Sequence, residues 1–288
     1  MRLRLPLFRP ALLLTALLTV SACQPTPEAA APAAPAPAAN TPAADATPAA
    51  ATPATADASA TPAAAPAPAE ATPPGPIVPP QGPAPVAGKQ YEQLPGGTPY
   101  QQVAGKIEVV EVFGYVCPAC ARFQPLVSAW KKKLPADVAF RYVPAPFGGE
   151  WIPYAKSFYV ADAMGLVERS HDALIDAIHL KQTMPGEGDK PDEQKIADFY
   201  AAYGADPKQF LAQMNSFAID AKVNGGKQFM IRTGVSSTPT LIINGKYRIA
   251  NGQEYEEVLR VADHLIAQER AAMSGAAPAP ASAATPAP

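Results

Sequence analysis

The sequence is poor in metal-binding residues and in clustered charge. Only three cysteines and three histidines occur among its 288 residues, and only two of the cysteines lie close together, so a four-ligand zinc site has no second pair. The 23 basic and 25 acidic side chains nearly balance, without a long basic run. We therefore expect no metal site and no nucleic-acid partner.

Large apolar side chains are almost absent from residues 24–86, which consist mainly of Ala, Pro and Thr and contain half of the 36 prolines. Such a composition cannot bury enough apolar surface to offset the conformational entropy lost on folding. Residues 275–288 have a similar composition. We predict a disordered tether over residues 23–86, one folded domain over residues 87–274 and a disordered Ala/Pro-rich tail.

Residues 1–22 have the pattern of an export signal. A basic segment over residues 2–9 precedes the apolar stretch Leu12–Val20, which is shorter than the about 20 apolar residues that span a membrane. Small residues lead up to Cys23, and this arrangement resembles the cleavage site of bacterial lipoproteins, whose three acyl chains would anchor the mature N-terminus firmly. Gln24, in place of an aspartate, favours the outer membrane. A plain secretory signal or an uncleaved anchor is the alternative.

Strand and helix patterns alternate in the folded part. Ile107–Phe113 is almost continuously apolar, which is typical of a strand buried on both faces, and Val138–Val143 is a second strand. A helix from Pro118 to about Lys133 lies between them. Thr240–Ile243 and Lys246–Ile249 flank an Asn-Gly pair, which predicts a hairpin with a type I′ turn. This order predicts an α/β sheet with helices on both faces.

Further helical patterns separate the two groups of strands. Residues 153–216 contain four short ones, which predict an inserted all-helical lobe. The predicted helices are Pro153–Met164, a helix capped by Ser170 and ending near Lys181, helices opened by Asp192 and Asp206, and then Phe217–Arg232 and Glu254–Ala272.

The chemistry is expected at Cys117-Pro118-Ala119-Cys120, which follows the first strand and opens the first helix. Backbone N–H groups and the positive end of the helix dipole favour a thiolate at this place. Cys117 at the exposed edge is then the nucleophile, and Cys120, one turn inside, resolves the mixed disulfide that the attack forms. There are two alternatives. The cysteine pair is half of a zinc site, or it forms a structural disulfide whose small ring stabilises the fold only weakly.

Pro239 precedes the apolar strand at Leu241 and removes a donor from the ladder. A proline in this place can be a cis residue with a functional purpose or an ordinary trans residue at a strand entry. The local sequence leaves both readings open.

Three stretches together resemble the DsbA family of bacterial thiol–disulfide oxidoreductases, which have a thioredoxin fold with an inserted helical domain. The resemblance extends from Gly88 to about Arg270. Its motifs are the run from Glu111 to Cys120, Phe147-Gly148-Gly149, and the run from Gly234 to Tyr247. It implies a redox-active Cys117–Cys120 disulfide with no separate cofactor.

The same resemblance implies that Pro239 is cis and packs beside the cysteine pair. The backbone of Thr238 would then pair with an extended substrate segment, with Pro118 and Ala119 at the same surface. Ala119 stands where the best-known members have histidine. Without that charge the Cys117 thiolate is less stabilised, so we expect a weaker oxidant.

The resemblance also gives Glu111 a role. It implies a buried acid six residues before Cys117, paired with a basic residue on the neighbouring strand, at the position of Arg141. Glu111 would accept a proton when Cys120 ionises. A solvent-facing glutamate at a strand edge is the alternative.

Two classes of function follow. The first is an enzyme that introduces disulfides into exported proteins in the periplasm and is reoxidised by a membrane quinone-linked partner of the DsbB type, although reduction or isomerisation uses the same residues. A dimerisation module has no room before residue 107, where only about Gly88 to Leu94 can fold, so we expect a monomer. The second is a non-catalytic thioredoxin-like binding protein or chaperone.

Overall fold

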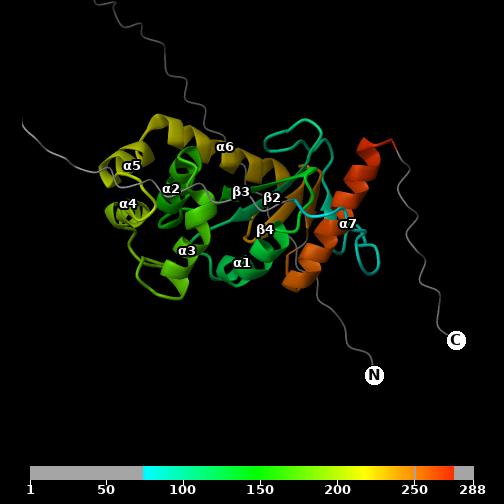
Figure 1. Cartoon of the computed structure of the whole chain (residues 1–288), viewed down its shortest axis with the longest axis horizontal. Helices are drawn as coiled ribbons and strands as arrows, with labels where there is room; N and C mark the ends of the chain where they lie inside the picture. Colours follow the sequence, from blue (N-terminus) through cyan, green and yellow to red (C-terminus); the bar gives the residue numbers. More distant parts are fainter. Residues whose placement is uncertain (1–73, 250, 276–288) are drawn as a thin grey trace, which may run out of the picture. The chain divides into compact units, whose positions relative to one another are not determined.

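The computed structural model describes residues 74–249 and 251–275 (Figure 1). The predicted signal peptide, Cys23 and most of the predicted tether lie outside the described residues, as does the tail beyond residue 275. Seven helices and five strands occur in the described part, and the strands form one sheet in the order β1-β5-β4-β2-β3.

β2 (Ile107–Phe113) is the central strand of the sheet. It pairs in parallel with β3 (Val138–Pro144) and antiparallel with β4 (Thr240–Ile243). Every residue of β2 is buried, which confirms the prediction of a strand covered on both faces. β5 (Tyr247–Ile249) follows β4 through a turn, and β1 (Tyr91–Gln93) pairs antiparallel with β5.

The β4–β5 turn is the predicted one. Its two central residues, Asn244 and Gly245, have φ values of 50° and 65°, as a type I′ turn requires. Asn and Gly adopt this left-handed region at low cost, so the local sequence was sufficient to predict the turn.

Helices cover both faces of the sheet (Figure 1). α1 (Pro118–Lys131) and α7 (Tyr255–Met273) pack in one apolar cluster with Ile107 and Val109 of β2. α6 (Phe217–Thr233) packs in another cluster with Val110 and Val112. Successive side chains of β2 therefore alternate between an α1/α7 face and an α6 face.

Four helices form a lobe beside the sheet. They are α2 (Trp151–Ala163), α3 (Val167–His179), α4 (Glu193–Ala201) and α5 (Pro207–Met214). The carboxylates of Asp192 and Asp206 cap α4 and α5 by accepting backbone N–H groups, as predicted. The prediction that Ser170 caps the third helix is wrong. Ser170 is buried inside α3, and its hydroxyl donates to the Leu166 carbonyl oxygen.

Residues 74–86 belong to the predicted tether, yet they pack against the domain. The Gly75 N–H donates to the Leu134 carbonyl oxygen at 3.0 Å, and the Gln81 carbonyl oxygen lies 3.1 Å from His264 Nε2. The Pro83 carbonyl oxygen accepts from Arg260. Backbone groups make these contacts, and for this reason a composition without large apolar side chains did not reveal them.

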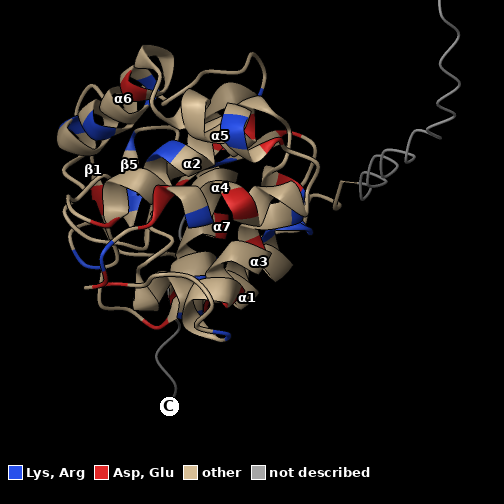
Figure 2. Ribbon diagram, turned by 90° about the vertical axis from the view of Figure 1, so that its left-hand side faces the viewer, with Lys and Arg blue, Asp and Glu red and all other residues tan. Residues whose placement is uncertain are grey.

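The surface carries charges of both signs. Figure 2 shows basic and acidic residues interspersed over the helices on the side that it presents. Among residues 74–249 and 251–275, no helix is long and apolar enough to cross a membrane.

Candidate active site

The fold places Cys117 at the N-cap of α1, directly after β2 and a three-residue loop. Its sulfur accepts a hydrogen bond from the Cys120 backbone N–H at 3.3 Å. Cys120 lies in the first helical turn with no exposed surface, whereas Cys117 is 6% exposed. Both thiols are free. The residue with the more exposed surface is therefore Cys117, the predicted nucleophile.

The two thiols differ in acidity. The pKa of Cys117 is lowered to about 6, mainly by a hydrogen bond with the Cys120 thiol and further by hydrogen bonds from Thr238 and from backbone N–H groups of α1. Burial raises the pKa of Cys120 well above its ordinary value. At neutral pH Cys117 is the thiolate and Cys120 keeps its proton.

Pro239 lies in the loop that approaches Cys117. Its peptide bond with Thr238 is cis, which confirms the implied geometry. The carbonyl oxygen of Thr238 is 3.6 Å from the Cys117 sulfur. The loop is further held by Asn251, whose side chain bonds both Ser237 and Thr240.

A groove of about 280 Å³ opens between the start of α1, the loop at Pro239 and the start of α7. Its lining includes Ala119 and Thr238, which are predicted substrate-binding residues, and Pro239. Pro118 is exposed but lies outside this lining. The Tyr255 hydroxyl donates to the Ala119 carbonyl oxygen at 3.0 Å and so fixes the wall of the groove beside Cys117.

Glu111 is fully buried and interacts electrostatically with both thiols, and neither of its carboxyl oxygens has a hydrogen-bond partner among the described residues. Burial is the main cause that raises the pKa of Glu111 to about 8, and the charge of Cys117 adds to it. Lys131 is the cation that opposes the shift. A carboxyl group with this pKa exchanges its proton close to neutral pH.

The predicted ion pair between Glu111 and Arg141 is absent. Glu111 stands opposite Tyr142 in the β2–β3 register, whereas Arg141 stands opposite Val110 and points to the α6 face. Arg141 pairs instead with Glu108, with Nε and Oε1 3.4 Å apart. Neither Glu108 nor Tyr142 is among the site residues that the sequence predicts, although alternation along the predicted strand already places Glu108 and Glu111 on opposite faces.

The lobe positions the loop that leads to Cys117. His179 Nε2 lies 2.7 Å from the Tyr115 carbonyl oxygen, and His171 Nδ1 lies 3.1 Å from the Tyr115 hydroxyl. Burial lowers the pKa of His171 to about 3, so this ring is neutral. A Cβ at Gly114 would lie 2.1 Å from the Trp151 ring, so the loop needs glycine there.

An acidic thiol at a helix N-terminus, with a second, protonated thiol in reach, is arranged to exchange one disulfide for another. No group of His, Cys, Asp or Glu that could hold a metal occurs among the described residues. The fold and site define a thioredoxin-fold thiol–disulfide oxidoreductase, in which the cysteine pair itself carries the electrons.

Comparison with known proteins narrows this class. A family model described as thioredoxin matches residues 102–264. The thiol:disulfide interchange protein DsbA of Pseudomonas aeruginosa is 42% identical over 188 residues, which is 65% of this chain and 86% of the relative. The DsbA protein of Azotobacter vinelandii is also 42% identical over 188 residues, 64% of this chain and 85% of the relative.

Solved structures agree with the sequence comparison. The crystal structure of DsbA from Xylella fastidiosa has a TM-score of 0.61 at 40% identity and covers 65% of this chain and 98% of that one. DsbA from Pseudomonas aeruginosa has a TM-score of 0.58 at 39% identity, covering 66% and 96%. The chain belongs to the DsbA family of thiol–disulfide oxidoreductases.

The site predicts the titration of the reduced protein. The rate of alkylation by iodoacetamide should rise with pH through a midpoint near 6, because Cys117 ionises there. The Cys120→Ala variant loses the thiol that bonds Cys117, so its midpoint should move up towards the ordinary cysteine value of about 8.5.

The Cys117→Ala variant is the control for this titration. It should show no titration below pH 8, because burial raises the pKa of the remaining thiol. A midpoint close to 8.5 in the unchanged protein would contradict an activated Cys117.

Proposed function

We propose that this protein introduces disulfides into exported proteins. The observation that carries the proposal is the Cys117 thiol, whose pKa is about 6, at the rim of an open groove. A stabilised thiolate stabilises the reduced form of the pair and makes Cys117 a good leaving group, so electrons flow from substrate to enzyme. Ala119 adds no charge of its own, so we expect a weaker oxidant than family members with histidine at this position.

The exchange consists of two displacements. A substrate thiolate attacks the Cys117 sulfur of the enzyme disulfide, and Cys120 leaves and takes up a proton. A second substrate thiolate then attacks the substrate sulfur of the mixed disulfide and expels the Cys117 thiolate. The substrate loses two electrons to the cysteine pair, which a quinone-linked membrane enzyme of the DsbB type would reoxidise.

The direction of electron flow can be measured in intact cells. Thiol trapping should find Cys117 and Cys120 mostly oxidised, since an oxidase is recharged faster than it is consumed. The Cys120→Ala variant cannot form the enzyme disulfide, but its Cys117 thiolate can attack a disulfide of an exported protein or of the reoxidising enzyme and displace the other sulfur as a thiolate. The mixed disulfides formed in this way should accumulate, because no Cys120 thiol resolves them, and they should be visible on non-reducing gels and absent after reduction.

The Cys117→Ala, Cys120→Ala double variant is the control and should trap nothing. A mostly reduced pair would instead indicate a reductase or isomerase. Absence of mixed disulfides in Cys120→Ala would favour a non-catalytic binding protein.

We further propose that Glu111 moves the proton of Cys120. Cys120 must lose a proton when it attacks the mixed disulfide with the reoxidising partner, and its burial opposes that loss. Glu111 interacts electrostatically with both thiols, and none of the described residues bonds its oxygens. Its carboxylate form, populated as pH rises through about 8, is the acceptor.

The Glu111→Gln variant should therefore slow the Cys120-dependent step by at least roughly 100-fold, the lower end of the usual range for general-base catalysis. Stopped-flow measurement of release from a Cys117 mixed disulfide should show an inflection in the unchanged protein and none in the variant. The inflection should fall below pH 8, because the Cys117 sulfur in a mixed disulfide carries no charge that would raise the pKa of Glu111.

The Glu108→Gln variant is the matched control, because it removes a buried carboxylate from the opposite face of β2. Its profile should keep the inflection, even if the protein is less stable. An inflection that survives in Glu111→Gln would refute the proton-acceptor role.

We also propose that the protein is a monomer tethered in the periplasm through acylated Cys23, with the outer membrane favoured by Gln24. The resemblance of residues 1–23 to a lipoprotein signal supports this anchor.

Cell fractionation tests the anchor. The Cys23→Ser variant should move from the membrane fraction to the soluble periplasmic fraction and should no longer incorporate labelled palmitate. Palmitate labelling that persists in this variant, or a wild-type protein found in the soluble fraction, would contradict acylation at Cys23.

A further inference from the structure

β3 forms one edge of the sheet. In a parallel pair, alternate residues direct both N–H and C=O to the neighbouring strand. The Ile107 N–H bonds the Asp137 carbonyl oxygen, and the Ala145 N–H bonds that of Phe113, so the odd-numbered residues of β3 face β2. Phe140 and Tyr142 therefore direct their N–H and C=O groups away from the sheet, where none of the described strands pairs with them.

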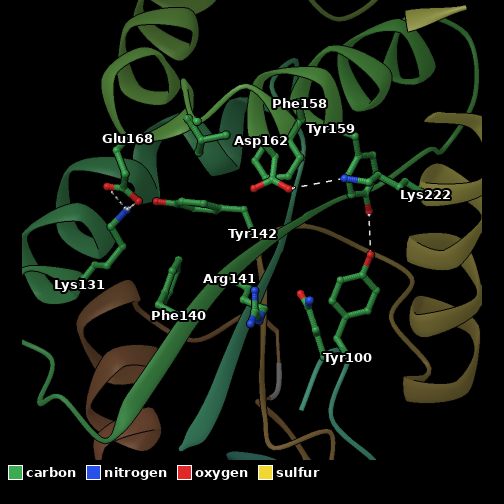
Figure 3. Close-up of a pocket in the computed structure, with 13 residues that line it drawn as sticks. Tyr100, Lys131, Phe140, Arg141, Tyr142, Phe158, Tyr159, Asp162, Glu168 and Lys222 are labelled. Carbon is green, nitrogen blue, oxygen red and sulfur yellow. Dashed lines mark hydrogen bonds and ion pairs between the residues drawn. The ribbon is translucent and has the colours of Figure 1, made fainter. Parts of the chain in front are cut away.

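A cavity of about 560 Å³ lies along this edge, between β3 and the helical lobe (Figure 3). Three consecutive residues of β3, Phe140, Arg141 and Tyr142, line it. Side chains of consecutive strand residues point to opposite faces, so all three can reach one cavity only where that cavity surrounds the strand edge. The free backbone groups of β3 therefore open into the cavity.

The two sides of the cavity differ in chemistry. Phe140 and Tyr142 form an aromatic side together with Phe158, and Lys131, paired with Glu168, lies over the rings of Phe140 and Tyr142 (Figure 3). On the other side lie Arg141, the rings of Tyr100 and Tyr159 and, from α6, Lys222. Among the described residues, Lys222 forms one ion pair, with exposed Asp162 at 3.9 Å. Exposed pairs of this kind contribute little, so Lys222 can turn to another carboxylate.

Arg141 can also form further hydrogen bonds. The carboxylate of its partner Glu108 already accepts two backbone N–H groups, from Tyr100 at 2.6 Å and from Gln101 at 2.8 Å. Arg141 Nε stands 3.4 Å from Glu108 and makes no hydrogen bond with any described residue. A guanidinium group in this position can donate to a carboxylate that enters the cavity.

We propose that the cavity binds an extended polypeptide segment as a sixth strand along β3. The segment pairs with the backbone of Phe140 and Tyr142. It carries an acidic residue facing Arg141 and Lys222, between two apolar residues that face the aromatic side. It thereby holds a second stretch of an unfolded exported protein, away from the groove at Pro239, since the two cavities share no lining residue.

That the bound segment belongs to an unfolded exported protein rests on the proposed function, whereas the binding of an extended peptide does not. We would test it with the full chain and a fluorescent seven-residue peptide without cysteine, with Glu at its centre between Val residues. Its binding, measured by anisotropy, is independent of disulfide exchange, so either can fail without the other.

N-methylation of the peptide backbone is the most specific test of strand pairing. An added strand bonds β3 through alternate amides, so N-methylation of one alternate set should weaken binding at least tenfold, and that of the other set should change it little. Equal effects from the two sets, or no binding by the unmodified peptide, would overturn strand addition.

Two variants locate the peptide. Arg141→Gln should weaken binding of the Glu peptide several-fold and leave binding of a peptide with central Gln unchanged. Lys208→Gln, at an exposed position of α5, removes a similar charge and should have no effect. A peptide that binds Arg141→Gln normally but loses affinity in Tyr255→Ala occupies the groove at Pro239, which would also overturn the proposal.

Discussion

The complete burial of β2 is the constraint on which the rest of this structure depends. A strand covered on both faces has no solvent side, so each of its side chains must find a place in one of two cores. Alternation then sends Glu108 to the α6 face and Glu111 to the α1 face, three residues apart in sequence but separated by the sheet. The end of the same strand delivers Cys117 to the N-terminus of α1.

The pKa values of Cys117 and Glu111 are shifted in opposite senses, each mainly by its own surroundings. Hydrogen bonds and the helix N-terminus favour the anion of Cys117, whose pKa is about 6. Burial favours the neutral acid at Glu111, and the nearby Cys117 charge raises the pKa of that carboxyl further, to about 8. Environments that separate two pKa values in this way assign the proton to one group and the negative charge to the other. The site is therefore prepared for thiol–disulfide exchange at neutral pH.

The helical lobe contributes more than a cover. Through Trp151, His171 and His179 it holds the loop before Cys117, so the orientation of the nucleophile depends on residues that are distant in sequence. The same lobe stands off from β3 and leaves the cavity along the free strand edge. Edges of this kind are ordinarily protected, because an unpaired strand is a template for another chain. Here the edge is recessed between charged and aromatic side chains.

The sequence by itself determined the features that depend on residues close together in the chain. The buried strand at Ile107–Phe113, the caps at Asp192 and Asp206, the Asn-Gly turn and the placement of the cysteine pair at a helix start all follow from local propensity and spacing. Resemblance to a family then supplied the cis bond before Pro239. Only the tertiary structure decided the partners of buried charges, because pairing depends on strand register and on which face each side chain takes. For that reason Arg141 lies with Glu108 rather than Glu111, and residues 74–86 join the domain through backbone groups that every sequence carries.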